Sequence, residues 1–295
     1  MKRAITVQDS LCSPEGSKEQ LLAPGTAINR TYVRLSNGIS LSVTKFIPVT
    51  VSRYPPVVMV PGLFSVMENF RHLLPDLTRD FTVYYLETRE KNSSICPEHS
   101  VFSIENMADD LNEVLKELDL NPAEFLLLGY SMGATVVLEA LSAQGRLPAG
   151  IILAGPAGSF GFPAWSLWLA RVAAPLYRVI KPLLKLYIKY FMVNHREDPE
   201  MHHIQTRVLD SADPYKLCAT LPELARYNIW DRLPPIACPL LIIGASKDSF
   251  HNHNDALRLS EMILNSTYID FETNLRNHSR EVVKTMKEFL HSSLT

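Results

Sequence analysis

The fold of this chain is decided by one stretch, FLLLGYSMG, at residues 125–133. The four apolar residues 125–128 predict a short buried strand, and the segment Ala134 to Ala143 has few helix breakers and predicts a helix. Ser131 therefore lies at a sharp turn from strand to helix, where its neighbours must be small because other backbone passes close to them. The N-terminus of the helix favours negative charge beside the hydroxyl. An ordinary turn with a serine N-cap is the alternative interpretation.

The composition limits the class of protein. The chain has 295 residues, of which 46% are hydrophobic, and this suits one large α/β domain with an insertion, or at most two domains. The net charge of −2 gives no basic excess, so we expect no nucleic-acid partner. No apolar run follows the charged start, and the cysteines have no metal or redox spacing, so we expect a cytoplasmic protein without a membrane anchor. The cysteines are Cys12, Cys96, Cys218 and Cys238.

Strands and helices alternate along most of the chain. Residues 1–28 predict a loosely ordered arm, and Asn37-Gly38 between two alternating runs predicts a hairpin of Thr31–Leu35 with Ile39–Ile47. Short apolar runs predict buried strands, and apolar stripes of helical period predict helices. The further strands are expected at Val57–Val60, Phe81–Leu86, Gly150–Ala154, Leu240–Ile243 and Thr267–Phe271, and the further helices at Met67–Arg79, Ile104–Leu118, Asp255–Leu264 and Arg280–Leu290.

This alternation predicts an α/β fold with a doubly wound, mostly parallel sheet. Residues 156–234 interrupt the alternation, because they read as mostly helical with no convincing buried strand. We therefore expect a core domain formed by residues 29–155 and 235–295, and a helical cap or lid formed by the insertion. Such a cap would lie over the carboxyl ends of the strands, where open α/β sheets bind ligands.

A serine nucleophile needs a general base, and the base needs an acid that orients it. Asp248 follows the strand Leu240–Ile243, and His278 follows the strand Thr267–Phe271, so both fall in loops at the sheet edge that carries Ser131. We expect Ser131, Asp248 and His278 to form a catalytic triad, with His251 and His253 as the rival bases. The two rivals could also suggest a metal site, but a polar loop after a strand explains them better and we expect no metal.

An oxyanion hole is the other requirement of acyl transfer. The N–H of Met132, directly after the serine, is the first expected donor. The second is expected from the loop that begins at Pro61-Gly62, with Leu63 preferred and Phe64 as the alternative, although these residues would equally form a plain turn. We expect Phe64, Tyr130 and Trp165 to contact the substrate.

These motifs resemble the α/β-hydrolase family, in its small-esterase and lipase-like branch with a helical cap. The resemblance covers about residues 30 to 292 and rests on GYSMG at 129–133, LIIGASKD at 241–248, NHS at 277–279 and PGLF at 61–64. The family usually has His-Gly where this chain has Pro61-Gly62, which bears on the conformation of the oxyanion loop. Relatives that cleave haloalkanes or epoxides use an aspartate as the nucleophile, whereas a serine suits acyl transfer.

The sequence therefore predicts a serine hydrolase that cleaves a small apolar ester through an acyl-enzyme intermediate, without a cofactor. A thioesterase, lactonase, C–C bond hydrolase or acyltransferase would use the same triad, and a non-catalytic binding protein is the reading from another class. The oligomeric state is left open.

The expected cap contains a segment, Trp165 to Val193, that has no acidic residue. Its cations fall on one side of a helix at about 100° per residue, and Pro175 and Pro182 would kink or split that helix. A solvated face is one interpretation, and a peripheral contact with an anionic membrane surface is the other. The cations are Arg171, Arg178, Lys181, Lys185 and Lys189.

Overall fold

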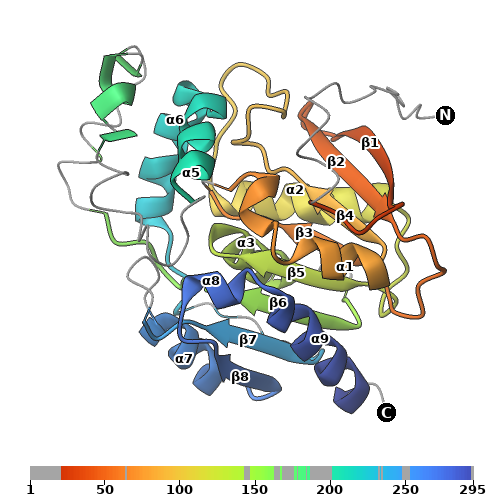
Figure 1. Ribbon diagram of the computed structural model, residues 1–295. Coiled ribbons are helices and arrows are strands. Elements are labelled where there is room, and N and C mark those ends of the chain that lie inside the picture. The colour runs from red at the N-terminus through yellow and green to blue at the C-terminus, as the bar shows by residue number, and fades with distance from the viewer. Residues whose placement is uncertain are drawn as a thin grey trace.

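An eight-stranded sheet forms the centre of the computed structural model (Figure 1). Its strand order is β1-β2-β4-β3-β5-β6-β7-β8, with β1–β2 and β2–β4 antiparallel and all other neighbours parallel. The strands are β1 (Ala27–Arg34), β2 (Ser40–Ile47), β3 (Val57–Val60), β4 (Val83–Leu86), β5 (Leu126–Tyr130), β6 (Gly150–Ala154), β7 (Leu240–Gly244) and β8 (Ser266–Asp270). The structure describes residues 21–63, 65–142, 147–162, 167, 176–177, 179–183, 185–186, 201–231, 233, 235–247 and 253–293.

Helices cover both faces of the sheet, as the doubly wound fold requires. One face packs against α2, α3 and α7, and the other packs against α1 and α9. The helices are η1 (Met67–Phe70), α1 (Leu74–Asp80), α2 (Ile104–Glu117), α3 (Met132–Ser142), α5 (Met201–Ser211), α6 (Pro214–Arg226), α7 (His253–Met262), α8 (Asn274–Asn277) and α9 (Arg280–Ser293).

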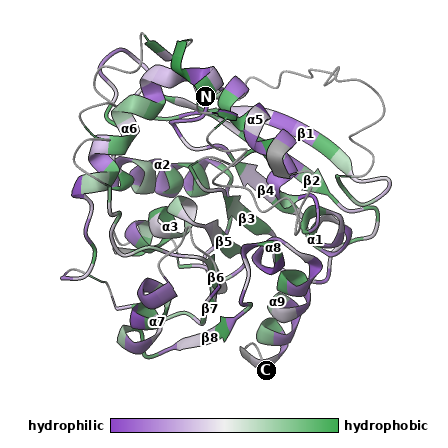
Figure 2. Ribbon diagram, turned by 60° about the vertical axis from the view of Figure 1, so that its left-hand side comes forward, coloured by the Kyte–Doolittle hydropathy of each residue, from purple (hydrophilic) through white to green (hydrophobic). Residues whose placement is uncertain are grey.

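Because the sheet is covered on both faces, successive residues of its central strands enter different cores. Val58 and Val60 of β3 belong to the core beneath α2 and α3, while Val57 and Met59 belong to the core beneath α1 and α9. All four side chains are fully buried, which explains why β3 reads as a continuous apolar run. Figure 2 shows the hydrophobic colour on these central strands. The predicted fold class is confirmed.

The predicted helix Met67–Arg79 is wrong as a single element. The chain instead forms the short 3₁₀ helix η1 and then, after a break, α1. Pro75 explains the break, because a proline ring clashes with the carbonyl of the residue four positions earlier and lacks an N–H to donate. In α1 Pro75 lies in the first turn, where neither constraint applies.

The N-terminal boundary also differs from the prediction. Strand β1 begins at Ala27, four residues before the predicted start, and pairs with β2 along its whole length. The expected arm falls largely on residues 1–20, which lie outside the described residues. Beyond them, Leu22 is buried in the core beneath α1 and α9, and the Ala23 N–H donates to Thr78 Oγ1.

The two inserted helices, α5 and α6, follow β6 and precede β7 in the chain. They contact the loops that leave the carboxyl ends of β3 and β4. Arg207 of α5 pairs with Glu68 at 3.1 Å, and Lys216 of α6 donates to the carbonyl oxygens of Lys91 and Ser94 at 2.8 and 2.5 Å. The insertion is therefore fixed against the edge of the sheet at which the candidate residues lie.

Candidate active site

Ser131 is the residue between β5 and α3, and its backbone is strained. Its φ is +51°, in the left-handed region that side chains with a Cβ rarely adopt. The Ser131 N–H donates to the Ala154 carbonyl oxygen at 2.9 Å, which ties the turn to the end of β6. Met132 is the first residue of α3, so its N–H has no acceptor within the helix and belongs to the helix N-terminus, where backbone N–H groups can bind an anion.

The two glycines of the motif are required by the close approach of backbone. A Cβ on Gly129 would lie 2.5 Å from Ala134 Cα, and a Cβ on Gly133 would lie 2.2 Å from the carbonyl oxygen of Val60 at the end of β3. Both distances are far below van der Waals contact. The sequence pattern thus reflects a tight strand–turn–helix packed directly against β3.

The loop after β3 lies beside Ser131, as expected for the second part of an oxyanion hole. A Cβ on Gly62 would lie 3.1 Å from Ser131 Cβ, so this backbone passes close to the serine side chain. Leu63, the preferred donor, is partly buried in the same loop, and Phe64, the alternative donor, lies outside the described residues. The loop closes a turn in which the Ser65 N–H donates to the Gly62 carbonyl oxygen at 3.2 Å.

His278 follows α8 and lies against the residue that precedes Ser131. Its ring centroid is 5.0 Å from that of Tyr130 and 5.2 Å from that of Phe70 in η1. Its Nδ1 lies 2.9 Å from the Asn274 carbonyl oxygen. A carbonyl oxygen can only accept, so Nδ1 carries the proton in this hydrogen bond, and the other ring nitrogen, Nε2, is an acceptor in that tautomer of the imidazole. Helix α8, which orients the ring, was absent from the sequence prediction.

The loops after β7 and β8 are joined by Asp270. Its Oδ1 accepts hydrogen bonds from the N–H groups of Ser246 at 2.9 Å and Glu272 at 2.8 Å. Partial burial by itself raises the pKa of Asp270, but these hydrogen bonds outweigh it and lower the pKa overall. Asp248, the predicted acid, lies just beyond the described part of the β7 loop.

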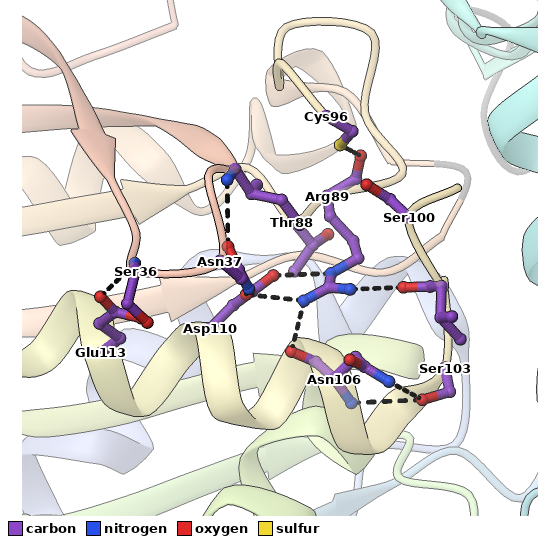
Figure 3. A network of polar contacts seen from close by, with 12 residues as sticks. Ser36, Asn37, Thr88, Arg89, Cys96, Ser100, Ser103, Asn106, Asp110 and Glu113 are labelled. Carbon is purple, nitrogen blue, oxygen red and sulfur yellow. Dashed lines mark hydrogen bonds and ion pairs between the residues drawn. The ribbon is translucent and has the colours of Figure 1, made fainter. Parts of the chain in front are cut away.

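A buried ion pair anchors the loop after β4 to α2 (Figure 3). Arg89 donates through Nε and Nη2 to the two carboxylate oxygens of Asp110, both at 2.7 Å. It also donates to the carbonyl oxygens of Val101 and Asn106. The two charged side chains are only 2% and 3% exposed. Burial raises the pKa of Asp110, and the hydrogen bonds from Arg89 oppose that rise.

The expected substrate contacts are placed unevenly. Trp165 lies outside the described residues, as Phe64 does, so their contacts with substrate stay predictions. Tyr130 has only 2% of its surface exposed. Its ring packs edge-on against Phe70 and lies tilted at 37° to the imidazole of His278. The Tyr130 ring thus packs against the imidazole, and its contact with substrate also stays a prediction.

The rival bases occupy other places. His251 lies outside the described residues. His253 begins α7, and its Nδ1 lies 3.1 Å from the hydroxyl of Tyr268 on the edge strand β8. Through this hydrogen bond His253 fixes α7 to β8, which is a structural role. Among the described residues, no group of three or more His, Cys, Asp or Glu side chains is arranged to hold a metal.

Two cavities border the candidate site. A small cavity of about 40 Å³ reaches His278 and is closed by residues before α1, from α5 and from α8. A larger one of about 510 Å³ lies between the inserted helices, the oxyanion loop and strand β1. Its lining is mixed, with charged groups such as Glu87 and Lys91 beside apolar ones such as Leu63 and Val208.

The expected basic face of the insertion is partly neutralised. Lys181 and Lys185, called here the lysine pair, contact Asp210 of α5 at 2.7 and 2.8 Å, and they lower the pKa of that carboxyl. The described residues of 176–186 are helical, and four of them form an exposed apolar stripe. This stripe consists of Leu176, Val179, Leu183 and Leu186, with exposed fractions of 51% to 73%. Within the described parts of the chain, no helix is both long and apolar enough to cross a bilayer.

A strained serine between a central parallel strand and a helix, with a histidine after the last strand of this eight-stranded order, is the arrangement of an alpha/beta hydrolase. The model of the alpha/beta hydrolase family matches residues 57–272, and the chain belongs to this family. The predicted membership is thus confirmed. The curated relative "Esterase YbfF" of Escherichia coli (strain K12) is 34% identical over 83 residues, which are 28% of this chain and 31% of the esterase. The match therefore spans about a third of that relative.

Solved structures share the fold over most of the chain. A hydrolase from Pseudomonas aeruginosa PA01 superimposes with a TM-score of 0.71 at 19% identity, covering 90% of this chain and 98% of that one. The esterase EaEST from Exiguobacterium antarcticum gives 0.71 at 20% identity, covering 90% and 99%. An enol-lactonase from Burkholderia xenovorans LB400 gives 0.70 at 20% identity, covering 88% and 99%. At these identities the likeness shows the common fold.

Proposed function

We propose that this protein is a serine hydrolase that cleaves a carboxylic ester through an acyl-enzyme intermediate. One observation carries the proposal: Ser131 stands at φ +51° on a turn between β5 and α3 that requires glycine on both sides. Such strain persists where a function needs it, and here it raises a hydroxyl above the end of a central strand. Membership of the alpha/beta hydrolase family supports the same conclusion.

In this mechanism His278 Nε2 takes the proton of the Ser131 hydroxyl as the oxygen attacks the ester carbonyl. The N–H groups of Met132 and Leu63 stabilise the negative oxygen of the tetrahedral intermediate. The intermediate collapses, the C–O bond to the alcohol breaks, and His278 gives its proton to the departing alcohol. Water then attacks the acyl-enzyme with the same proton transfers. Asp248, which lies outside the described residues, is the proposed acid that orients the imidazole.

The cavities support both halves of this cycle. The small cavity beside His278 has room for at least one water molecule, which the deacylation step consumes. The larger cavity borders Leu63 and residues of α5 and α6, so the inserted helices act in this proposal as the cap that selects the substrate. Its mixed lining favours an ester with an apolar acyl or aromatic group and a polar part, rather than a wholly apolar one.

The test is covalent labelling with a fluorophosphonate probe, followed by mapping of the labelled peptide. The wild type should be labelled on Ser131, and Ser131→Ala should lose both the label and turnover of p-nitrophenyl esters by several orders of magnitude. The turnover by His278→Ala should fall to a similar level. His253→Gln is the matched control and should keep its activity. An active Ser131→Ala variant, or an inactive His253→Gln beside an active His278→Ala, would overturn the assignment.

The chemistry of the leaving group is settled by a panel rather than by the fold, because one triad serves several acyl transfers. Acyl esters of graded chain length, thioesters and lactones should be compared by kcat/KM, and we expect the esters to lead. Lactones belong in the panel because one structural neighbour is an enol-lactonase. Equal turnover of all three classes would contradict the ester assignment but would leave Ser131 as the nucleophile.

A further inference from the structure

The side chain of Lys91, in the loop after β4, is directed at the oxyanion loop. Its Nζ donates to the carbonyl oxygens of Gly62 at 2.7 Å, Leu63 at 2.6 Å and Ser65 at 3.0 Å. The side chain is only 11% exposed. Three acceptors require three N–H donors, which an ammonium has and a neutral amine lacks. A buried cation is therefore held by the carbonyl groups of one short loop.

These contacts determine which way the loop presents its N–H groups. A peptide unit is planar and trans, so its C=O and N–H point in opposite directions. Because the Gly62 carbonyl points at Lys91, the N–H of the same peptide unit, which belongs to Leu63, points away from Lys91. Gly62 is also the residue whose backbone passes close to Ser131. Pro61 before it has no N–H that would anchor the loop by a backbone hydrogen bond.

Lys91 is itself held from two directions. Arg89, two residues earlier, fixes the β4 loop to α2 through its ion pair with Asp110. From the inserted helix α6, Lys216 donates to the Lys91 carbonyl oxygen at 2.8 Å. Glu90 lies 3.4 Å from the ammonium and balances its charge. Burial lowers the pKa of Lys91, while Glu90 and Glu87 oppose this change.

We propose that Lys91 is the positioning residue of the oxyanion hole: by binding the carbonyl oxygens of Gly62 and Leu63, it turns the Leu63 N–H toward the oxygen of the tetrahedral intermediate. This inference rests on the proposed serine hydrolase activity. Lys91 also borders the larger cavity, but its ammonium hydrogens are directed at the three carbonyl oxygens of the loop. In this scheme it therefore acts through the loop and does not donate to the substrate. Removing it should therefore impair the transition state and leave binding of the ester nearly unchanged.

The test compares Lys91→Met with the wild type on p-nitrophenyl butyrate, with rates expressed per active site titrated by the fluorophosphonate probe. We expect kcat to fall by at least about tenfold, since loss of a whole oxyanion donor costs about 100-fold to 1,000-fold, while KM changes less than about twofold. Affinity for a trifluoromethyl ketone with the same acyl chain, which forms the tetrahedral adduct, should fall by the same factor as kcat/KM. Lys284→Met, on the exposed surface of α9, is the matched control and should behave as the wild type.

A purely structural role gives a different pattern. Partial unfolding lowers the number of titratable sites and the melting temperature but leaves kcat per site unchanged, and that result overturns the proposal. So does a loss that appears in KM alone. If Lys91→Met does not fold, Lys216→Met replaces it in the test, because it removes the hydrogen bond from α6 to the Lys91 carbonyl oxygen. Its kcat should also fall, by a smaller factor and with KM nearly unchanged. An unchanged kcat in this variant overturns the proposal. If the wild type itself has no Ser131-dependent activity, the proposed function fails. If the wild type is active and Lys91→Met is equally active, only the role of Lys91 fails, so the two failures can be distinguished.

Discussion

Replacing Arg89 by Met should destabilise the protein more than any other single charge removal in the described residues. The change deletes the four side-chain hydrogen bonds that Arg89 donates, two of them to Asp110. The Asp110 carboxylate then stays buried, with the Asn37 amide at 3.1 Å as a remaining donor. Leaving one member of a buried pair behind costs about 3–5 kcal/mol.

That loss corresponds to a fall in melting temperature of about 6–10 °C, at about 2 °C per kcal/mol for a chain of this size. The loss should also depend on pH. Without Arg89 the pKa of Asp110 rises further above the unfolded value of about 3.9. A raised carboxyl pKa means that stability falls as the pH increases through the folded value, so the loss at pH 8 should exceed that at pH 5.

The assay is urea unfolding followed by circular dichroism at both pH values. The matched comparison is the double variant Arg89→Met/Asp110→Leu, which also removes the orphaned carboxylate. It should be destabilised by clearly less than the sum of the two single variants, because the interaction between the partners is removed together with both charges. The reasoning is refuted if Arg89→Met unfolds within about 1 kcal/mol of the wild type, which is the range of an exposed pair, or if the two single losses simply add.

Two further predictions concern other parts of the surface. Asp270 has a lowered pKa, so its charge contributes stability that is present above about pH 3.9 and is lost as the pH falls through the lowered value. The melting temperature of Asp270→Asn should therefore lie below that of the wild type at pH 7, and the difference should shrink as the pH is lowered below about 3.9. We also propose that the exposed apolar stripe touches anionic bilayers. The double variant Val179→Gln/Leu183→Gln should therefore reduce co-sedimentation with phosphatidylserine vesicles. Neutralising the lysine pair should reduce it less, because both lysines are already paired with Asp210. A wild type that stays in the supernatant at low salt contradicts this.

The order of strands and helices was predictable from the sequence because it depends on local patterns. Buried parallel strands such as β6 read as short apolar runs, and the amphipathic stripe of α2 marked it within one residue of its observed end. The serine turn was predictable because its glycines are forced by backbone contacts. The break before α1 was missed because the apolar pattern continued across it, and Pro75 decided the outcome.

The supporting residues of the candidate site could not be predicted in the same way. Residues 87–94 read as a polar loop, and polar loops are usually solvated, yet Arg89 and Glu90 are 2% and 5% exposed. Their burial depends on α2 and on the oxyanion loop, which lie far away in sequence. Lys91 is a similar case, since a lone lysine in a polar loop carries no signal that its partners are the carbonyl oxygens of residues 62–65.

The positive φ of Ser131 has a practical consequence for trapping a complex. Alanine at this position removes the hydroxyl but keeps the strain, which for a residue with a Cβ amounts to about 1–2 kcal/mol. Glycine removes both the hydroxyl and the strain. Its greater conformational freedom in the unfolded chain lowers the free energy of unfolding by only about 0.4–1 kcal/mol. The glycine variant is therefore the better host for crystallising an intact ester, because this inactive form should be more robust than the active protein from which it is made.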